Sequence, residues 1–332
     1  SITIDTIAPA APLITTTTAL TNDNTPTIEG TAEAGSTIEL FNGSNSLGTV
    51  IAADNDTFSI TSSVLADADY TLTVTATDEA GNTSSPSVGL PITIDTTAPD
   101  APVITTKSSD LDLSDNTPII SGTAEVGSTV NLFVNGQLPD PTDIFTVTDS
   151  TGVFTFDFTN NPIADDSYVI TFTATDEAGN ESAASAGLNL IIDTTAPAAP
   201  VISTTIALTN DNTPTIEGTA EAGSTVELFN GNTSLGTATA DCNGDFSITS
   251  SELADSSYTL TVTATDEAGN TSVPSAELSI TIDTEAPNTP TSIEISSSIT
   301  NDSTTLSITG TAVTGSSVQL LNGSTIIGTA QA

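Results

Sequence analysis

Hydrophobic and polar residues alternate along most of this chain. The clearest stretch is 258–265, which reads Y-T-L-T-V-T-A-T, so that its apolar residues point to one side and its four threonines to the other. A period of two residues predicts a β-strand with one buried and one solvated face. Threonine has a high strand propensity, and its hydroxyl suits the solvated face. The pattern therefore predicts an all-β protein that exposes threonine and serine.

The same alternation predicts a set of short strands at 199–202, 215–221, 225–229, 235–240, 246–250, 258–265 and 278–282. Turns rich in Gly, Asn and Asp separate these segments. Seven short strands in one unit are typical of an immunoglobulin-like β-sandwich. Tyr70, Tyr168 and Tyr258 open equivalent strands, and we interpret them as tyrosine corners that pin the preceding loop.

Internal repeats divide the chain into several such sandwiches. The motif I-D-T-x-A-P places an aspartate at 5, 95, 193 and 283, with spacings of 90, 98 and 90 residues. The string T-D-E-A-G-N recurs at 77–82, 175–180 and 265–270, and residues 22–37 are identical to 210–225. We expect tandem seven-stranded sandwiches arranged as an extended rod. Their predicted bounds are 1–5 (last strand of a preceding repeat), 6–95 (repeat 1), 96–193 (repeat 2), 194–283 (repeat 3) and 284–332 (an incomplete repeat 4).

Repeats 2 and 4 differ from the other two. Repeat 2 is longer, mainly through Gln137–Ile144, whose two prolines predict a loop insertion. Residues 284–332 supply the first four strands of a sandwich, and half a sandwich would expose an apolar face and open strand edges. We therefore expect that the molecule continues beyond both ends, or that a neighbouring chain completes the last repeat.

Charge excludes several classes of partner. The chain has 42 acidic residues and one basic residue, Lys107, for a formal net charge of −41. Nucleic acids and anionic membranes are recognised by clustered Lys and Arg, so neither is an expected partner. No apolar run approaches the length of a membrane span, so direct membrane insertion is not expected either.

The residues that carry most enzyme chemistry are missing. The sequence contains no His, Met or Trp, and its one cysteine, Cys242, lies in a predicted turn. Neither a G-x-S-x-G elbow nor a phosphate-binding glycine loop is present. Acidic residues are plentiful but recur in the same turns of each repeat, as structural residues do. We predict no catalytic residues, no organic cofactor and no enzyme activity.

The repeated strings resemble a known family. I-D-T-T-A-P at 94–99 and 192–197, together with N-D-N-T-P, G-T-A-E-x-G-S and T-D-E-A-G-N, is similar to the Ig-like repeats of giant secreted bacterial adhesins, including biofilm-associated and type I-secreted repeats-in-toxin adhesins. The resemblance covers the whole chain. It implies an extracellular stalk at the cell surface and calcium ions at the junctions between repeats.

Acidic turns are expected to converge at these junctions. In the sandwich topology, the exit of one repeat brings the linker aspartate close to the T-D-E-A-G-N loop of the next, and Asp115 or Asp165 can add to the junction after repeat 2. Calcium takes six to eight oxygen ligands in a forgiving geometry, and crowded carboxylates repel one another without a cation. Asp and Asn are also ordinary turn residues whose side chains satisfy backbone N–H groups, so the residues alone leave both readings open. The predicted metal ligands are Asp5, Asp78, Glu79, Asn82, Asp95, Asp176, Glu177, Asn180, Asp193, Asp266, Glu267, Asn270 and Asp283.

Two functions remain open on this basis. The first is a structural extender, or stalk, of a cell-surface adhesin that calcium stiffens at the junctions, with further Ig-like repeats of the same parent chain as its partners. The second is a subunit of a self-assembling extracellular filament or biofilm matrix fibre, in which neighbouring chains take part.

Overall fold

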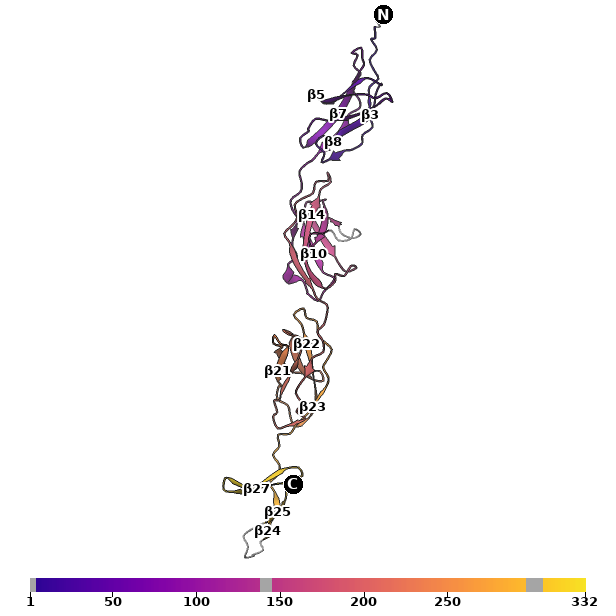
Figure 1. Cartoon of the computed structure of the whole chain (residues 1–332). Coiled ribbons are helices and arrows are strands. Elements are labelled where there is room, and N and C mark those ends of the chain that lie inside the picture. Colours follow the sequence, from indigo (N-terminus) through magenta and orange to yellow (C-terminus); the bar gives the residue numbers. More distant parts are fainter. Residues whose placement is uncertain (1–3, 138–144, 297–306) are drawn as a thin grey trace. The chain divides into compact units, whose positions relative to one another are not determined.

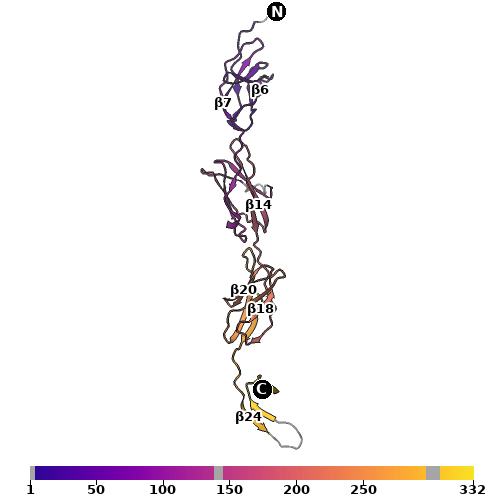
Figure 2. The same ribbon diagram turned by 90° about the vertical axis from the view of Figure 1, so that its left-hand side faces the viewer.

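The computed structural model describes residues 4–137, 145–296 and 307–332. Its contacts divide the chain into two units, 1–195 and 196–332, and each repeat is described here by itself. In both ribbon views, the strands of each repeat gather into a separate body (Figures 1 and 2). The predicted all-β fold of tandem sandwiches is confirmed.

Repeat 1 consists of two packed sheets. Its three-stranded sheet has the order β1 (Leu13–Ile14), β3 (Thr27–Thr31), β6 (Thr57–Thr61). Its five-stranded sheet has the order β2 (Leu20–Thr21), β8 (Leu90–Ile94), β7 (Ala68–Thr77), β4 (Thr37–Asn42), β5 (Asn45–Ile51). All pairs are antiparallel except β2 with β8, which is parallel.

The chain forms one further short strand after the first predicted strand, and the two lie in different sheets. We call the first of these strand A and the second strand A′, and we call the last strand of each sandwich strand G. Strand A pairs with β3 in one sheet, and strand A′ pairs with strand G in the other. Repeats 1 and 3 thus have the seven strands expected of the sandwich and, in addition, the short strand A′ in the other sheet.

Repeat 3 reproduces this arrangement. Its three-stranded sheet is β16 (Val201–Ile202), β18 (Thr215–Thr219), β21 (Asp245–Thr249). Its five-stranded sheet is β17 (Leu208–Thr209), β23 (Leu278–Ile282), β22 (Ser256–Thr265), β19 (Thr225–Asn230), β20 (Thr233–Thr239). Each strand that alternation predicted is present within its predicted segment, to within one or two residues, and β17 is the strand that alternation missed.

Repeat 2 keeps the two layers but has no counterpart of strand A′ among its described strands. Its sheets are β9 (Val103–Ile104), β10 (Ile119–Thr123), β13 (Val153–Asp157), and β12 (Phe145–Val147), β11 (Thr129–Val134), β14 (Asp166–Thr175), β15 (Leu188–Ile192). A 3-10 turn, η1 (Ser108–Asp110), lies where A′ would begin. Of the predicted insertion, Gln137 pairs with Val134, and 138–144 lie outside the described residues.

Residues 284–332 form two separate two-stranded sheets. β24 (Thr291–Ser296) pairs with β25 (Ser307–Thr311), and β26 (Ser317–Asn322) pairs with β27 (Thr325–Gln331). Apolar side chains remain exposed there, with Ile295 64% and Leu321 53% accessible. That more of the same chain or a neighbouring chain completes this repeat stays a prediction.

The core of each complete repeat lies between its two sheets. In repeat 1 it is built from inward-facing residues of strands in both layers, such as Ile28, Leu40 and Val74, each fully buried. The glycine near the end of β3 is required by close approach: a Cβ on Gly30 would lie 2.2 Å from the Leu13 carbonyl oxygen and 2.5 Å from the Phe58 ring. This contact explains why the G-T-A-E motif begins with glycine.

Buried serines complete the hydrogen bonding of the longest strand. After the T-D-E-A-G-N loop, the chain runs beside β7, where Ser84 Oγ accepts the Ala76 N–H at 3.0 Å and Ser87 Oγ accepts the Val74 N–H at 3.1 Å. Ser87 Oγ also donates to the Val88 carbonyl at 3.0 Å. By contrast, Ser62 Oγ is buried without a hydrogen-bond partner among the described residues.

Ser87 and Ser62 allow a serine-to-alanine substitution to be tested at two sites with opposite expected results. Ser87→Ala leaves the Val74 N–H buried and unsatisfied, so we expect a loss of about 1–3 kcal/mol in the stability of repeat 1. Ser62→Ala removes a hydroxyl that already lacks a partner, so we expect a change between zero and about 1 kcal/mol of stabilisation. Urea unfolding followed through the amide signals of β7 measures both, and an equal loss in the two variants would contradict the assignment.

Candidate functional site

Each linker begins with an aspartate whose carboxylate closes a local turn. Oδ1 of the linker aspartate accepts the backbone N–H two residues later at 2.9 Å for Asp5, 3.1 Å for Asp95, 3.1 Å for Asp193 and 3.2 Å for Asp283. This hydrogen bond is the Asx turn that Asp commonly forms. One carboxylate oxygen of every linker is therefore engaged in shaping the turn that precedes Ala-Pro.

The T-D-E-A-G-N loop is closed by its own Asp and Asn. The Asn82 backbone N–H donates to Asp78 Oδ1 and Asn82 Nδ2 donates to Asp78 Oδ2, both at 2.8 Å. The side-chain hydrogen bond from Asn82 lowers the pKa of Asp78 below its ordinary value. Gly81 has φ +89°, a conformation that favours glycine. The same two bonds close the loops of repeats 2 and 3 at Asp176–Asn180 and Asp266–Asn270.

The asparagine of this loop also contacts the linker that enters its repeat. Asn180 Nδ2 donates to the Asp95 carbonyl oxygen at 2.8 Å, and Asn82 Nδ2 donates to the Asp5 carbonyl oxygen at 3.3 Å. In both cases the amide joins the loop carboxylate to the linker backbone. The following repeat thereby holds the linker through a side chain that its own loop has already fixed in place.

The preceding repeat holds the same linker through another aspartate. Asp67 Oδ1 accepts Thr96 Oγ1 at 2.8 Å and the Thr96 N–H at 3.1 Å, while Asp67 Oδ2 accepts Thr97 Oγ1 at 2.8 Å. In repeat 2, Asp165 accepts the hydroxyls of Thr194 at 2.9 Å and Thr195 at 2.7 Å. We use the name linker clamp for this aspartate together with the following repeat's asparagine.

The third linker has one hydroxyl donor fewer than the first two linkers. Asp255 Oδ1 accepts the Thr284 N–H at 3.0 Å and Thr284 Oγ1 at 2.8 Å. Glu285 occupies the position of Thr97 and Thr195, so the second hydroxyl donor is replaced by a carboxylate.

A tyrosine positions each clamp aspartate. The hydroxyls of Tyr70, Tyr168 and Tyr258 donate to the carbonyls of Ala66, Ala164 and Ala254 at 2.9, 3.0 and 3.0 Å. The accepting alanine directly precedes the clamp aspartate in each repeat. The predicted tyrosine corners are confirmed, and they fix the backbone from which the carboxylate reaches the linker.

The structure places the predicted ligands in two groups. The linker aspartates and the Asp–Asn pairs lie at the junction loops, as described above, whereas the side chains of Glu79, Glu177 and Glu267 are exposed. Sequence reasoning named Asp165 as a possible addition but missed Asp67 and Asp255. Their signal was the repeated A-D-x-x-Y, which places an aspartate three residues before each tyrosine.

These junction groups fit calcium in the type of ligand. Carboxylate, amide and backbone carbonyl oxygens are the donors that calcium prefers. In the described ranges, however, no three Asp, Glu, His or Cys side chains come together as a group that could hold a metal ion. Both oxygens of Asp78 and of Asp176 already accept hydrogen bonds from asparagine. An ion at these loops would therefore compete with the asparagine for the same carboxylate oxygens.

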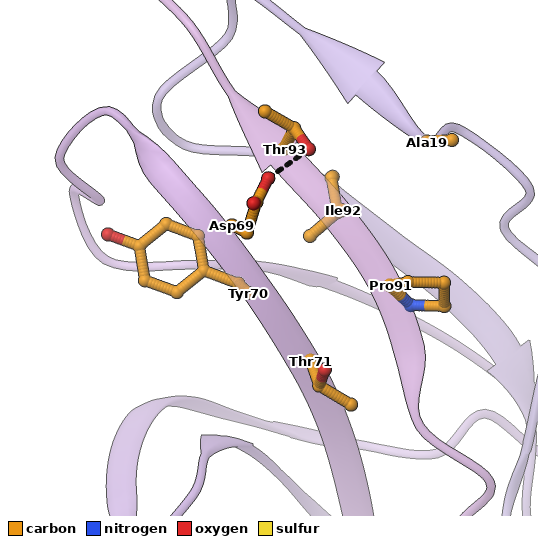
Figure 3. Close-up of a pocket in the computed structure, with 7 residues that line it drawn as sticks. All are labelled: Ala19, Asp69, Tyr70, Thr71, Pro91, Ile92 and Thr93. Atoms are coloured by element: carbon orange, nitrogen blue, oxygen red, sulfur yellow. Dashed lines mark hydrogen bonds between the residues drawn. The ribbon is translucent and has the colours of Figure 1, made fainter.

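A shallow hollow lies on the five-stranded sheet of repeat 1. Figure 3 shows Asp69 turned toward Thr93, to which it is hydrogen-bonded. The lining residues are Ala19, Asp69, Tyr70, Thr71, Pro91, Ile92 and Thr93. This lining contains one carboxylate, whereas glycoside hydrolysis uses a pair. The described part of the chain also contains no helix of the length and apolarity needed to cross a bilayer.

Comparison with protein families identifies the repeats. The family described as bacterial Ig-like domain matches residues 10–96, 104–194 and 202–284. Among curated proteins, exoglucanase B of Cellulomonas fimi is 34% identical over 134 residues, which cover 36% of this chain and 12% of the enzyme. Because the match spans about an eighth of that enzyme, it carries no information about catalysis here.

Solved structures share the fold at low identity. A tetra-tandem repeat from the extending region of a large adhesion protein is 21% identical, with a TM-score of 0.30, covering 84% of this chain and 75% of that one. The BSP domain of a biofilm associated protein is 15% identical, with a TM-score of 0.23, covering 84% and 67%. These values describe a likeness of fold and carry no argument about function.

The linker clamp predicts a dependence on acid pH. The hydroxyl of Thr97, followed by that of Thr96, holds the pKa of Asp67 below its ordinary value, and Thr195 followed by Thr194 does the same for Asp165. Because these pKa values are lowered, the clamp stabilises the linker above the ordinary pKa of about 3.9 and is lost as pH falls through the lowered value. Carboxyl carbon shifts should show both midpoints below about 3.9.

Thr97→Val provides the control for this titration. It removes one hydroxyl donor, so the midpoint of Asp67 should rise while that of Asp165 stays unchanged. An unchanged midpoint for Asp67 would show that the Thr97 hydroxyl does not hold its carboxylate.

Proposed function

Because the chain belongs to the bacterial Ig-like domain family, we propose that it is a spacer segment of a bacterial cell-surface adhesin and lies outside the cell. Bacterial Ig-like repeats are typical of surface and secreted proteins. The observation that carries the proposal is the linker clamp, in which side chains of adjacent sandwiches hold the short segment between them. A spacer needs such joints because it must hold its repeats in order without chemistry of its own.

The composition suits this role. A charge of −41 on 332 residues keeps neighbouring chains apart and the surface hydrated. Outward-facing threonines give the sheets a polar surface that is not basic. The three sandwiches each have their own core, so the length of the spacer can change by whole repeats without disturbing the folding of the others.

We further propose that calcium binds at the junctions. The candidate ligands between repeats 1 and 2 are the carboxylates of Asp95 and Asp176, the Asn180 side chain and the Asp95 carbonyl oxygen, all of them oxygen donors or able to present one. A bound divalent ion would supply the positive charge that the sequence lacks and reduce the repulsion between linker and loop. The hydrogen bonds of the linker clamp already hold the linker, so the ion would add to the clamp rather than create it.

Removal of calcium tests this part of the proposal. A ligand that binds only the folded state raises stability in proportion to the logarithm of its concentration over its Kd, so calcium should raise the melting temperature and EGTA should reverse the effect. The double variant Asp95→Asn/Asp176→Asn should lose the response of one junction. Glu277→Gln, which removes an exposed acid outside the junctions, serves as the control and should keep the full response.

Titration calorimetry provides the second readout. Absence of heat on calcium addition, together with identical melting curves in calcium and EGTA, would rule out the calcium mechanism and leave the spacer held by its hydrogen bonds alone.

A further inference from the structure

Strand A′, which follows strand A, lies beside strand G, through which the chain leaves the sandwich, in repeats 1 and 3. In repeat 1, strand A′ (β2) pairs in parallel with strand G (β8) through Leu20–Thr93 and Thr21–Ile94. The flanking backbone bonds run from the Thr93 N–H to the Ala19 carbonyl at 2.8 Å and from the Asp95 N–H to the Thr21 carbonyl at 3.1 Å. Repeat 3 has the equivalent bonds from Thr281 and Asp283 at 2.9 and 3.0 Å.

The parallel direction of strands A′ and G determines how their hydrogen bonds are loaded when the chain is pulled from its ends. A pull on a tandem chain draws strand A′ toward its N-terminal side and strand G toward its C-terminal side. Because the two strands run in the same direction, the pull slides them past each other, and the bonds between them are loaded together rather than opened one at a time. Resistance to forced unfolding depends on the unfolding rate, and therefore on these bonds, which must break first.

Repeat 2 lacks this pairing because its chain takes a different path after strand A, in the segment where strand A′ would form. Two more residues lie between Ile104 and Pro118 than between the matching isoleucine and proline of repeats 1 and 3. They are taken up in the 3-10 turn η1. Asp112 replaces the leucine of strand A′, and its carboxylate accepts the Ser114 N–H at 3.0 Å, which turns the chain locally.

The contacts of this segment with strand G are correspondingly fewer. Among the described residues, the Asp193 N–H donates to the Leu113 carbonyl at 2.8 Å, and Ser108 Oγ donates to the Asn189 carbonyl at 2.8 Å. No parallel strand pair is formed in the described part of repeat 2. Strand A itself does not differ, since β1, β9 and β16 each pair with their neighbour at two positions.

We propose that repeat 2 is the mechanically weak one among the three complete sandwiches, the first of the three to unfold under tension, which lengthens the spacer while repeats 1 and 3 stay folded. This role goes beyond that of a passive spacer, and it rests on hydrogen bonds within single repeats. It is therefore independent of calcium at the junctions. A chain with one yielding repeat limits the force that reaches whatever its ends are attached to.

Single-molecule force measurements on the full 332-residue chain, held by its two ends, test the proposal. Three unfolding events are expected, and repeat 2 is recognised because it is eight residues longer than the others, which adds roughly 3 nm of extended chain. At constant force, repeat 2 should unfold at least about tenfold faster than repeats 1 and 3, the effect of removing about one backbone hydrogen bond from the loaded set.

Two variants make the assignment specific. Replacing residues 105–114 of repeat 2 by residues 203–210 of repeat 3 installs the shorter A′ segment, and it should slow the unfolding of repeat 2 to the rate of repeat 3. Thr93→Pro removes the N–H that bonds to Ala19, and it should speed the unfolding of repeat 1. Thr93→Ser keeps that N–H and should leave the rate of repeat 1 unchanged.

The outcomes separate this inference from the calcium proposal. Equal unfolding rates for the three events in EGTA, or a chimera that leaves the rate of repeat 2 unchanged, would overturn the assignment of the weak repeat. Neither result would bear on whether calcium binds at the junctions, because the heat and melting measurements of the intact chain report on that separately.

Discussion

Burial of one face of every strand between two sheets is the constraint on which the rest of this molecule depends. Ile, Leu and Val from both layers fill each core, and Phe154, Phe156 and Phe172 of repeat 2 meet there with ring centroids 5.0 to 6.1 Å apart. Because successive side chains of a strand point to opposite faces, burying one residue turns its two neighbours outward, where threonine and acidic residues are tolerated. The single cysteine of the sequence allows no disulfide within the chain, so the hydrophobic cores and the hydrogen bonds around them account for the stability of each sandwich.

The turns between the strands use acidic residues as hydrogen-bond acceptors more than as free charges. Asp149 and Asp241 each close the turn before a strand by accepting backbone N–H groups. The Thr151 hydroxyl, followed by the backbone N–H of Val153, lowers the pKa of Asp149, and the backbone N–H groups of Asp245 and Asn243 lower the pKa of Asp241. The same chemistry recurs in the T-D-E-A-G-N loops and at the linkers. An acidic protein of this kind can therefore carry a large negative charge while many of its carboxylates remain satisfied by donors of its own chain. The charge that remains uncompensated is what a divalent cation would reduce.

Period-two alternation was enough to predict the two-layer sandwich and most of its strands, since residues 258–265 of β22 have a pattern that fits no other element. The tyrosine corner was predictable because it joins residues only four positions apart. Strand A′ was not, since two residues such as Leu208 and Thr209 cannot show a period. The clamp aspartates were missed for a related reason: Asp67 meets Thr96 and Thr97 across about thirty residues of sequence, and only the folded pairing of β7 with β8 brings them together. Local motifs are visible in one sequence, whereas contacts set by sheet register are not.

Repeats 1 and 3 are nearly identical in sequence, so the positions at which repeat 2 differs from both can be related to its structure. The core of repeat 2 compensates for its changes, with Phe172 where the other repeats have valine, so the sandwich itself is retained. Its added residues instead lie outside the core, two of them between Ile104 and Pro118 and the others mainly in 137–144. Changes confined to these places leave the buried face intact but alter which bonds connect the first and last strands. In a tandem array that is loaded through its ends, those bonds are in series with every neighbour, so a two-residue insertion in one repeat can set the force at which the whole array begins to lengthen.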